Sequence, residues 1–278
     1  MVFLATVLWS TAGLFVRLLD LDSWTILGWR SVFAALALGV IVFWQRRQAD
    51  AATNSSLPIT LLTIPIAVVS MAAYVVSLKL TTVANVMVVY ATVPLIAAGL
   101  AWIFLRETPH ARVLVASGLA LVGVVVMVGG AALTADLAGM AVALLMTLAM
   151  GGQIVLARKF PTLDMAMINM VAAAICALLG LSLSAWQIPD AADLVILFLF
   201  GVSNTALAYY FVLRGARVVA SAEVGLISTL DVVLGPLWVW LLVQEVPGGS
   251  TVAGGMIVFA AVVGYLWMQR SKSHGSPT

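Results

Sequence analysis

Apolar and polar positions follow one another in long blocks along this chain, and short polar breaks separate apolar runs of about 20 residues. At about 1.5 Å of rise per residue, a helix of that length crosses the roughly 30 Å hydrocarbon layer of a membrane. The pattern predicts ten such helices, at residues 2–19, 24–44, 59–78, 83–105, 112–131, 137–157, 164–184, 193–213, 221–243 and 250–269.

The runs favour helices over strands. A stretch such as "LVGVVVMVGG", residues 121–130, stays apolar and does not alternate as the strands of a membrane barrel do. Backbone groups inside lipid must find their hydrogen bonds within the segment, which a helix provides. The first run lacks a basic start and a convincing cleavage site, so we interpret it as a retained helix rather than a signal peptide. The predicted fold class is therefore all-α integral membrane protein.

Composition supports a membrane protein, because 64% of the residues are hydrophobic and 9% are charged. Soluble domains carry about 25% charged residues. The net charge of +2 therefore indicates no nucleic-acid partner, and the lipid bilayer is the expected surrounding. One cysteine, Cys176, allows no internal disulfide, and with two histidines it argues against a structural metal site.

Basic residues give the expected orientation. If the N-terminus is cytoplasmic, the outer side carries Arg17, Arg30 and Lys79. The inner side then carries the other ten of the 13 basic residues: Arg46, Arg47, Arg106, Arg112, Arg158, Lys159, Arg214, Arg217, Arg270 and Lys272. The positive-inside rule thus places both termini in the cytoplasm. We expect a multi-pass protein of a bacterial inner membrane with a disordered cytoplasmic tail at residues 271–278.

The chain repeats itself after 138 residues. "AWIFLRETP" at residues 101–109 and "WVWLLVQEVP" at residues 238–247 end two apolar runs in the same way. A shift of 138 aligns Lys79 with Arg217, Ala84 with Ala222, Val86 with Val224, Trp102 with Trp240, Glu107 with Glu245 and Pro109 with Pro247. The repeat unit is five helices, an odd number, so the two halves are predicted to be inverted, at residues 1–133 and 134–270. Inverted repeats are typical of secondary transporters.

These motifs, together with "LWSTAGLFVRL" at residues 8–18 and "WRSVFAALAL" at residues 29–38, resemble the drug/metabolite transporter superfamily, specifically its ten-helix EamA-type members. The resemblance covers residues 1–270 and is greatest to the bacterial aromatic amino-acid exporters. It implies a central cavity surrounded by helices 1, 3, 4, 6, 8 and 9. The chain departs from the family where helix 9 often has an acidic residue followed by proline, because Asp231 is followed by Val232 and the proline is Pro236.

Asp231 is the acidic residue that we place near the membrane midplane, where a carboxylate costs at least about 2.5 kcal/mol on insertion scales. It could bind a proton or a substrate amino group, or it could make a structural hydrogen bond. Asn204 and Gln153 could join helices or hold a zwitterionic ligand. With the helices that the resemblance implies, the expected cavity-lining residues are Trp9, Tyr74, Tyr90, Gln153, Asn204 and Asp231.

Three prolines interrupt predicted helices and are candidates for kinks or gates: Pro65, Pro94 and Pro236. Pro94 and Pro236 are 142 residues apart, one turn away from the 138-residue register, so the two helices are expected to bend at slightly different depths. Glu107 and Glu245 end their helices and are expected to be surface or gate residues.

The sequence predicts a secondary transporter rather than an enzyme. His110 lies in a loop and His274 in the tail, so no catalytic cluster is visible, and no phosphate-binding loop is present for ATP. The first helix lacks the deep glutamate of the small cation exporters. We expect export of amino acids with aromatic or other hydrophobic side chains by alternating access, without cofactor or metal. Export of other metabolites or drugs is the alternative, and a membrane-embedded enzyme is a weaker one. A monomer is compatible with the sequence, which does not decide the oligomeric state.

Overall fold

The structure is a computed structural model that describes residues 1–48, 56–81, 83–128, 137–184, 188–244 and 248–273. All regular structure in these ranges is helical. Each of the ten predicted runs is helical, which confirms the all-α membrane architecture. Among the described helices, nine stretches are long and apolar enough to cross a membrane, and the first, Val2–Arg17, is shorter.

Six of the runs form one continuous helix each. These helices are α3 (Ser23–Gln48), α4 (Leu57–Leu80), α7 (Ala111–Val128), α8 (Leu137–Lys159), α9 (Met165–Leu183) and α14 (Gly249–Ser273). The last of them extends three residues into the segment predicted as the tail, of which residues 274–278 lie outside the described part. The long polar connection predicted at residues 45–58 also falls largely outside it, at residues 49–55.

The other four runs are divided into shorter segments. They consist of α1 (Val2–Ser10) with α2 (Ala12–Arg17), α5 (Val83–Tyr90) with α6 (Val93–Leu105), α10 (Ala191–Leu199) with the π-helix η1 (Phe200–Leu207) and α11 (Ala208–Gly215), and α12 (Ser221–Ser228) with α13 (Asp231–Val243). Broken helices expose backbone groups, which in membrane proteins is tolerated where they are covered by protein or line a cavity. The sequence pattern did not predict these breaks.

Local residues determine where several helices begin and end. The Asp164 side chain accepts a hydrogen bond from the Met167 amide at 2.9 Å and caps the start of α9. Asp190 and Asp193 form a reciprocal capping box at the start of α10. Such caps supply acceptors for amides that have no partner inside the helix.

The two halves repeat in structure as well as in sequence. Adding 138 to the bounds of α5 (83–90) gives 221–228, which are the bounds of α12, and adding it to α6 (93–105) gives 231–243, the bounds of α13. Each pair ends alike, because Arg106 and Gln244 both have a left-handed backbone, with φ of 58° and 62°. The breaks at residues 91–92 and 229–230 therefore occupy the same place in both halves, consistent with an inverted five-helix repeat.

The prolines do not mark these breaks in the same way. Pro94 is the second residue of α6, directly after its break, whereas Pro236 lies inside α13, five residues beyond Asp231. Proline is well tolerated at the start of a helix, where its missing N–H has no partner to lose. Pro65 lies inside α4. Their role in gating remains a prediction.

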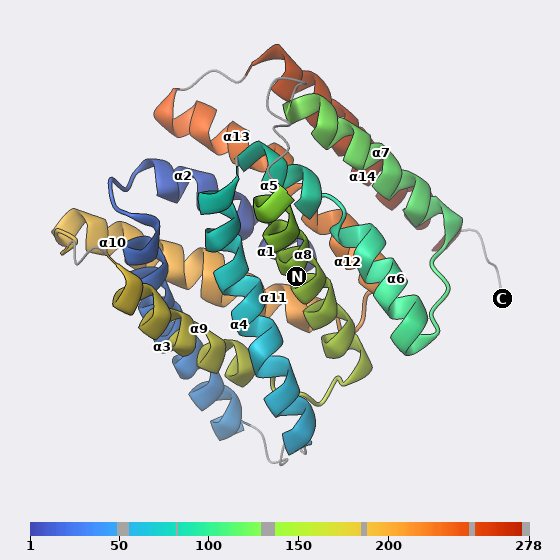
Figure 1. The fold of residues 1–278 in the computed structure, drawn as a ribbon. Helices are drawn as coiled ribbons and strands as arrows, with labels where there is room; N and C mark the ends of the chain where they lie inside the picture. The colour runs from blue at the N-terminus through green and yellow to red at the C-terminus, as the bar shows by residue number, and fades with distance from the viewer. Residues whose placement is uncertain (49–55, 82, 129–136, 185–187, 245–247, 274–278) are drawn as a thin grey trace.

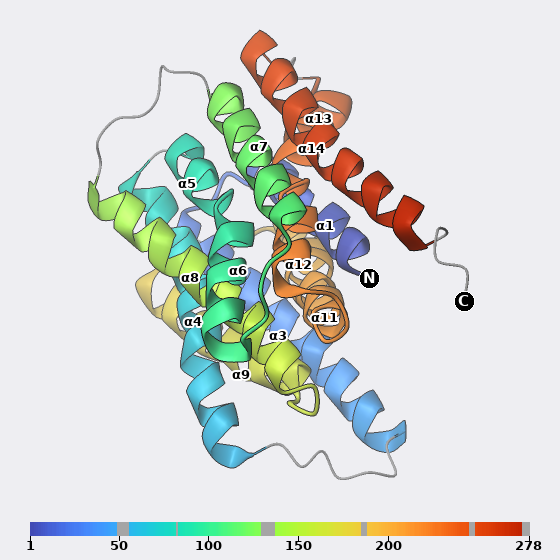
Figure 2. The same ribbon diagram turned by 90° about the vertical axis from the view of Figure 1, so that its right-hand side faces the viewer.

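The helices pack in pairs across the bundle. In Figure 1, α7 and α14 run side by side along one edge and α3 and α9 along the opposite edge, with α4 and α8 adjacent between them, and these are the three most extensive helix contacts. The view in Figure 2 shows α6 and α12 together near the centre. There a Cβ added to Gly225 on α12 would lie 2.7 Å from the Cα of Pro94 on α6. The halves therefore cross closely at a position where only glycine fits.

Candidate functional site

Asp231 begins α13, directly after the break that follows α12. It is partly buried, and its carboxylate lies close to the Val232 amide and interacts with the Tyr90 side chain. One carboxylate oxygen, Oδ1, is buried and has no hydrogen-bond partner among the described residues. The start of a helix favours negative charge, because its amides point toward it. The break thus holds a carboxylate inside the bundle with one oxygen available to a ligand.

Arg30 was counted among the outer loop charges in the sequence analysis, and the structure corrects this placement. Its position is seven residues inside α3, about 10 Å along the helix from its start. The residue is 7% exposed, and its guanidinium lies 5.1 Å from the centre of the Phe200 ring. The predicted count of basic residues becomes ten inner and two outer, because Arg30, one of the three residues predicted on the outer side, lies inside the bundle. The residues around Arg30 in the sequence are apolar, as in other membrane helices, so its charge was the one sequence feature that could have marked it as a site residue.

Aromatic side chains connect Arg30 with Asp231. Tyr74 on α4 lies within electrostatic range of both charged groups, and Tyr209 on α11 lies within range of Arg30 and interacts with Ser70. The Trp9 and Tyr209 rings meet edge to face, with centroids 5.4 Å apart. Such edge-to-face pairs are favourable because the positive edge of one ring meets the negative face of the other. The structure thus brings Trp9, Tyr74, Tyr90 and Asp231, four of the six predicted lining residues, into one cluster.

The two predicted amide residues behave differently. Asn204 lies in the π-helix and donates hydrogen bonds to the backbone carbonyls of Leu8, at 2.9 Å, and Trp9, at 2.8 Å. These carbonyls are at the end of α1, so Asn204 joins two helices, which agrees with the helix-joining alternative. Gln153 on α8 is fully buried, and within the described part of the chain neither polar atom of its amide has a hydrogen-bond partner. Buried amides without partners are uncommon, so Gln153 stays a candidate for a polar ligand contact.

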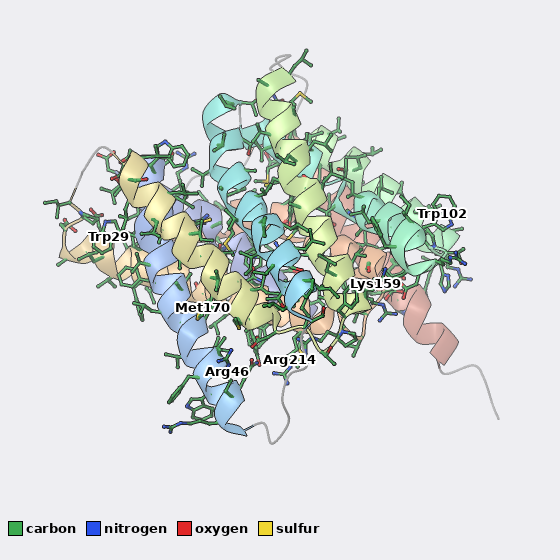
Figure 3. All side chains as sticks on the ribbon, turned by 60° about the horizontal axis from the view of Figure 1, so that its bottom comes forward. Trp29, Arg46, Trp102, Lys159, Met170 and Arg214 are labelled. Carbon is green, nitrogen blue, oxygen red and sulfur yellow. The ribbon has the colours of Figure 1, made fainter. Side chains whose placement is uncertain are left out.

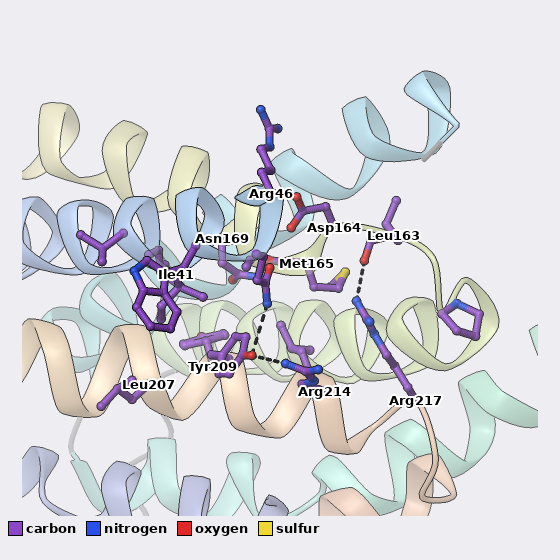
Figure 4. Close-up of a pocket in the computed structure, with 18 of the residues that line it drawn as sticks. Ile41, Arg46, Leu163, Asp164, Met165, Asn169, Leu207, Tyr209, Arg214 and Arg217 are labelled. Atoms are coloured by element: carbon purple, nitrogen blue, oxygen red, sulfur yellow. Dashed lines mark hydrogen bonds between the residues drawn. The ribbon is translucent and has the colours of Figure 1, made fainter. Parts of the chain in front are cut away.

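A cavity of about 1160 Å³ opens between α3, α9 and α11 at the end of the bundle where these helices meet their loops (Figure 4). None of the six predicted residues lines it, but Tyr209 does. The lining residues are Leu38, Val40, Ile41, Trp44, Gln45, Arg46, Pro161, Thr162, Leu163, Asp164, Met165, Ala166, Asn169, Leu207, Tyr209, Tyr210, Leu213, Arg214 and Arg217. Apolar positions of α3 and α11 in this list were predicted as ordinary membrane-helix residues, and no sequence signal marked them as cavity walls.

Basic side chains surround the mouth of this cavity. Figure 3, which brings this end of the bundle forward, shows Arg46 on α3 and Arg214 on α11. Gln45 and Arg214 both donate to the Tyr210 hydroxyl, and Arg217 donates to the Leu163 carbonyl at 2.7 Å. Burial lowers the pKa of the Arg217 guanidinium, and the neighbouring positive charge of Arg214 lowers it further. The mouth is therefore suited to attract anionic groups.

An ion pair joins the ends of two helices next to the cavity. Arg158, near the end of α8, donates to Glu107, just beyond the end of α6, at 3.0 Å. Arg158 also donates to the Arg217 carbonyl at 3.4 Å. Glu107 belongs to the repeated motif, and the left-handed backbone of Arg106 turns the chain toward this contact. Its repeat mate, Glu245, lies outside the described residues.

Comparison with known proteins identifies the family. The sequence profile of the EamA-like transporter family matches residues 1–129 and again residues 135–267. The chain belongs to the EamA-like transporter family. The two matches together cover nearly the whole transporter and give one EamA unit to each half. They show a membrane transporter of the drug/metabolite transporter superfamily rather than an enzyme, and they do not indicate its substrate.

Solved structures show the fold of this EamA transporter independently. One, titled "Crystal structure of protein", superposes with a TM-score of 0.83 at 18% sequence identity and covers 97% of this chain and 96% of the other. At that identity the likeness establishes the fold alone. No curated protein matches the chain. Within the described residues, no group of three or more His, Cys, Asp and Glu side chains is placed to hold a metal ion.

Proposed function

We propose that this transporter exports amino acids with aromatic or other hydrophobic side chains by alternating access. The observation that carries the proposal is the position of Asp231 beside Tyr74 and Tyr90, where the broken helices of the two halves meet. Its Oδ1 has no hydrogen-bond partner among the described residues. The resemblance to the aromatic amino-acid exporters agrees with it. The proposed pocket needs no cofactor or metal.

The chemistry of the cluster suits such a substrate. An ammonium group can form an ion pair with Asp231 and lie against the ring faces of Tyr74 or Tyr90. An apolar or aromatic side chain can pack among the same rings, as small-molecule sites usually combine apolar walls with a few polar groups. Gln153, whose buried amide has no partner among the described residues, is proposed as a further polar contact, although it is not part of this cluster. Together these groups distinguish an amino acid from a purely apolar molecule.

The repeated breaks support a mechanism of alternating access. Breaks at residues 91–92 and 229–230 give each half a hinge at the same depth, next to the proposed pocket. In an inverted repeat, an exchange of conformation between the halves turns an opening toward one side into an opening toward the other. The Glu107–Arg158 ion pair, which joins the ends of α6 and α8, and the close crossing of Gly225 and Pro94 are proposed to hold these helices together during the exchange.

We further propose that both termini are cytoplasmic and that the protein lies in a bacterial inner membrane. The support is the charge asymmetry of ten basic residues to two, after Arg30 is removed from the outer set. The halves are proposed to be residues 1–133 and 134–270, and the proposed pocket is built within one chain. In this orientation the 1160 Å³ cavity opens toward the cytoplasm.

Cells that overproduce the protein test the proposed function. Toxic analogues of aromatic amino acids should inhibit these cells less than control cells that carry Asp231→Asn, because export lowers the internal concentration. Organic cations should be included, because an acidic residue among aromatic rings also suits a cationic drug. Resistance to the cations without resistance to the analogues would replace the amino-acid proposal with drug export.

A further inference from the structure

Arg30 is a buried cation without a counter-ion in the described structure. The residue is 7% exposed, and its buried Nε has no hydrogen-bond partner in the described ranges. Arg30 forms no hydrogen bond and no ion pair with any described residue, and its one specific contact is the Phe200 ring. Charged side chains inside membrane helices are costly and usually pair with another group or face a cavity.

The neighbours of Arg30 do not neutralise it. The groups that interact with it electrostatically are the side chains of Tyr74, Tyr209 and Cys176, all of them uncharged in their ordinary state. Asp231 is engaged by Tyr90 and by the Val232 amide instead. A ring contact offsets only part of the loss of hydration of a guanidinium. The site therefore offers a guanidinium whose donors have no acceptor among the residues that the structure describes.

We propose that Arg30 binds the carboxylate of the transported molecule, so that the protein selects substrates that carry a carboxylate. The inference rests on the proposed function for the identity of the substrate. A guanidinium matches a carboxylate with two parallel hydrogen bonds, which suits an arginine better than a lysine here. The bound carboxylate also supplies the missing counter-charge.

Tyr74 connects this site to Asp231, because it lies within electrostatic range of both charges. An α-amino acid presents the carboxylate that Arg30 lacks and an ammonium that suits the carboxylate of Asp231. An amine without the carboxylate leaves Arg30 without a counter-ion. Tyr209 lies within electrostatic range of Arg30 and also lines the 1160 Å³ cavity, so the cavity reaches a residue close to Arg30.

The test compares three ligands that share one aromatic side chain: phenylalanine, 3-phenylpropionate and phenethylamine. Binding to the purified protein in lipid nanodiscs is measured for wild type and for Arg30→Gln. The matched control is Arg47→Gln, the same change on the same helix at an exposed position. We expect Arg30→Gln to weaken the binding of phenylalanine and 3-phenylpropionate, the two ligands with a carboxylate, by at least about tenfold, as for a lost charged hydrogen bond. The binding of phenethylamine should be unchanged. Arg47→Gln should change none of the three.

An equal loss of affinity for all three ligands, or no loss of affinity for the two carboxylates, would overturn the proposal that Arg30 binds the substrate carboxylate. If Arg30→Gln fails to fold, Arg30→Lys replaces it: the lysine keeps the charge but loses the paired hydrogen bonds, so it should weaken the carboxylates selectively and by a smaller factor. Failure of the proposed function is distinguishable. Wild-type binding of 3-phenylpropionate that depends on Arg30, without transport of any amino acid, would keep the carboxylate site and reject amino-acid export.

Discussion

Tyr90, the last residue of α5, interacts with Asp231, the first residue of α13, so the broken helices of the two halves meet at their interruptions. The repeat mates of these residues are Ser228 and Val93, neither of which can form the same contact. The backbone of the two halves is therefore alike at these breaks, but the Tyr90–Asp231 contact has no counterpart at the repeat-related positions. This is expected of a transporter in which the repeated backbone allows the halves to exchange conformations while unlike side chains bind the substrate.

Asp231→Asn should keep the fold and lower transport by about tenfold or more, because the amide is nearly isosteric but removes a charged contact. The measurement is the initial rate of amino-acid transport in proteoliposomes, with thermal unfolding of the purified variant alongside. If Asp231 carries a proton, the response to an imposed pH gradient disappears. If it binds only the substrate ammonium, the apparent affinity falls and the gradient response remains.

The control for this variant is Asp20→Asn, which makes the same change at an exposed position between α2 and α3. It should transport at the wild-type rate. A folded Asp231→Asn protein with unchanged rate, affinity and gradient response would assign the carboxylate to structural hydrogen bonding with Tyr90 and Val232.

Gly225→Ala should destabilise the protein by about 1–3 kcal/mol, because its Cβ would stand 2.7 Å from the backbone Cα of Pro94 and α6 and α12 would have to separate. Gly99→Ala on α6 is the matched control, since no other atom lies within 4 Å of its added Cβ. Thermal unfolding in detergent compares the two. Equal unfolding temperatures would show that the halves do not cross as closely as described.

The ion pair between Glu107 and Arg158 should affect transport more than stability. Both side chains are partly exposed, at 36% and 25%, so loss of the pair should change the free energy of unfolding by no more than about 1 kcal/mol. Glu107→Gln should alter the transport rate, and the charge-reversed double variant Glu107→Arg with Arg158→Glu should restore it. Arg112→Gln, at an exposed position on α7, serves as the control. A double variant no better than Glu107→Gln alone would exclude a gating pair.

Orientation can be measured with single cysteines in a Cys176→Ala background. Cys176 is fully buried, and its removal should cost about 1 kcal/mol. Cysteines at the exposed positions Ser56 and His110 should react with an impermeant thiol reagent only from the cytoplasmic side, and one at Ala191 only from outside. The reverse pattern in intact cells would invert the orientation.

Hydrophobic run length was sufficient to predict the ten helices, because lipid leaves a continuous apolar segment little alternative to a helix. The breaks at residues 91–92 and 229–230 were not predictable, since the one threonine in each, Thr92 or Thr229, does not by itself end a membrane helix and tertiary packing decides the interruption. Pro94 and Pro236 even suggested different depths for the two bends.

The candidate site was also predictable only in part. Asp231 was recognisable because a carboxylate in a membrane helix is rare. Arg30 carries an equally rare charge, but it stands near the start of its apolar run and was therefore counted with the loop residues. The cavity beside Tyr209 depends on the separation of α3, α9 and α11 at this end of the bundle, and no single sequence position predicts that separation.

Transport by the purified protein tests the central claim most directly. Proteoliposomes that contain only this protein are given a panel of labelled amino acids, with and without a pH gradient, and protein-free liposomes serve as the control. The account predicts saturable transport of aromatic and other hydrophobic amino acids, inhibited by one another and reduced in Asp231→Asn. Transport of organic cations but of no amino acid, or no transport of any amino acid in the panel, would contradict it.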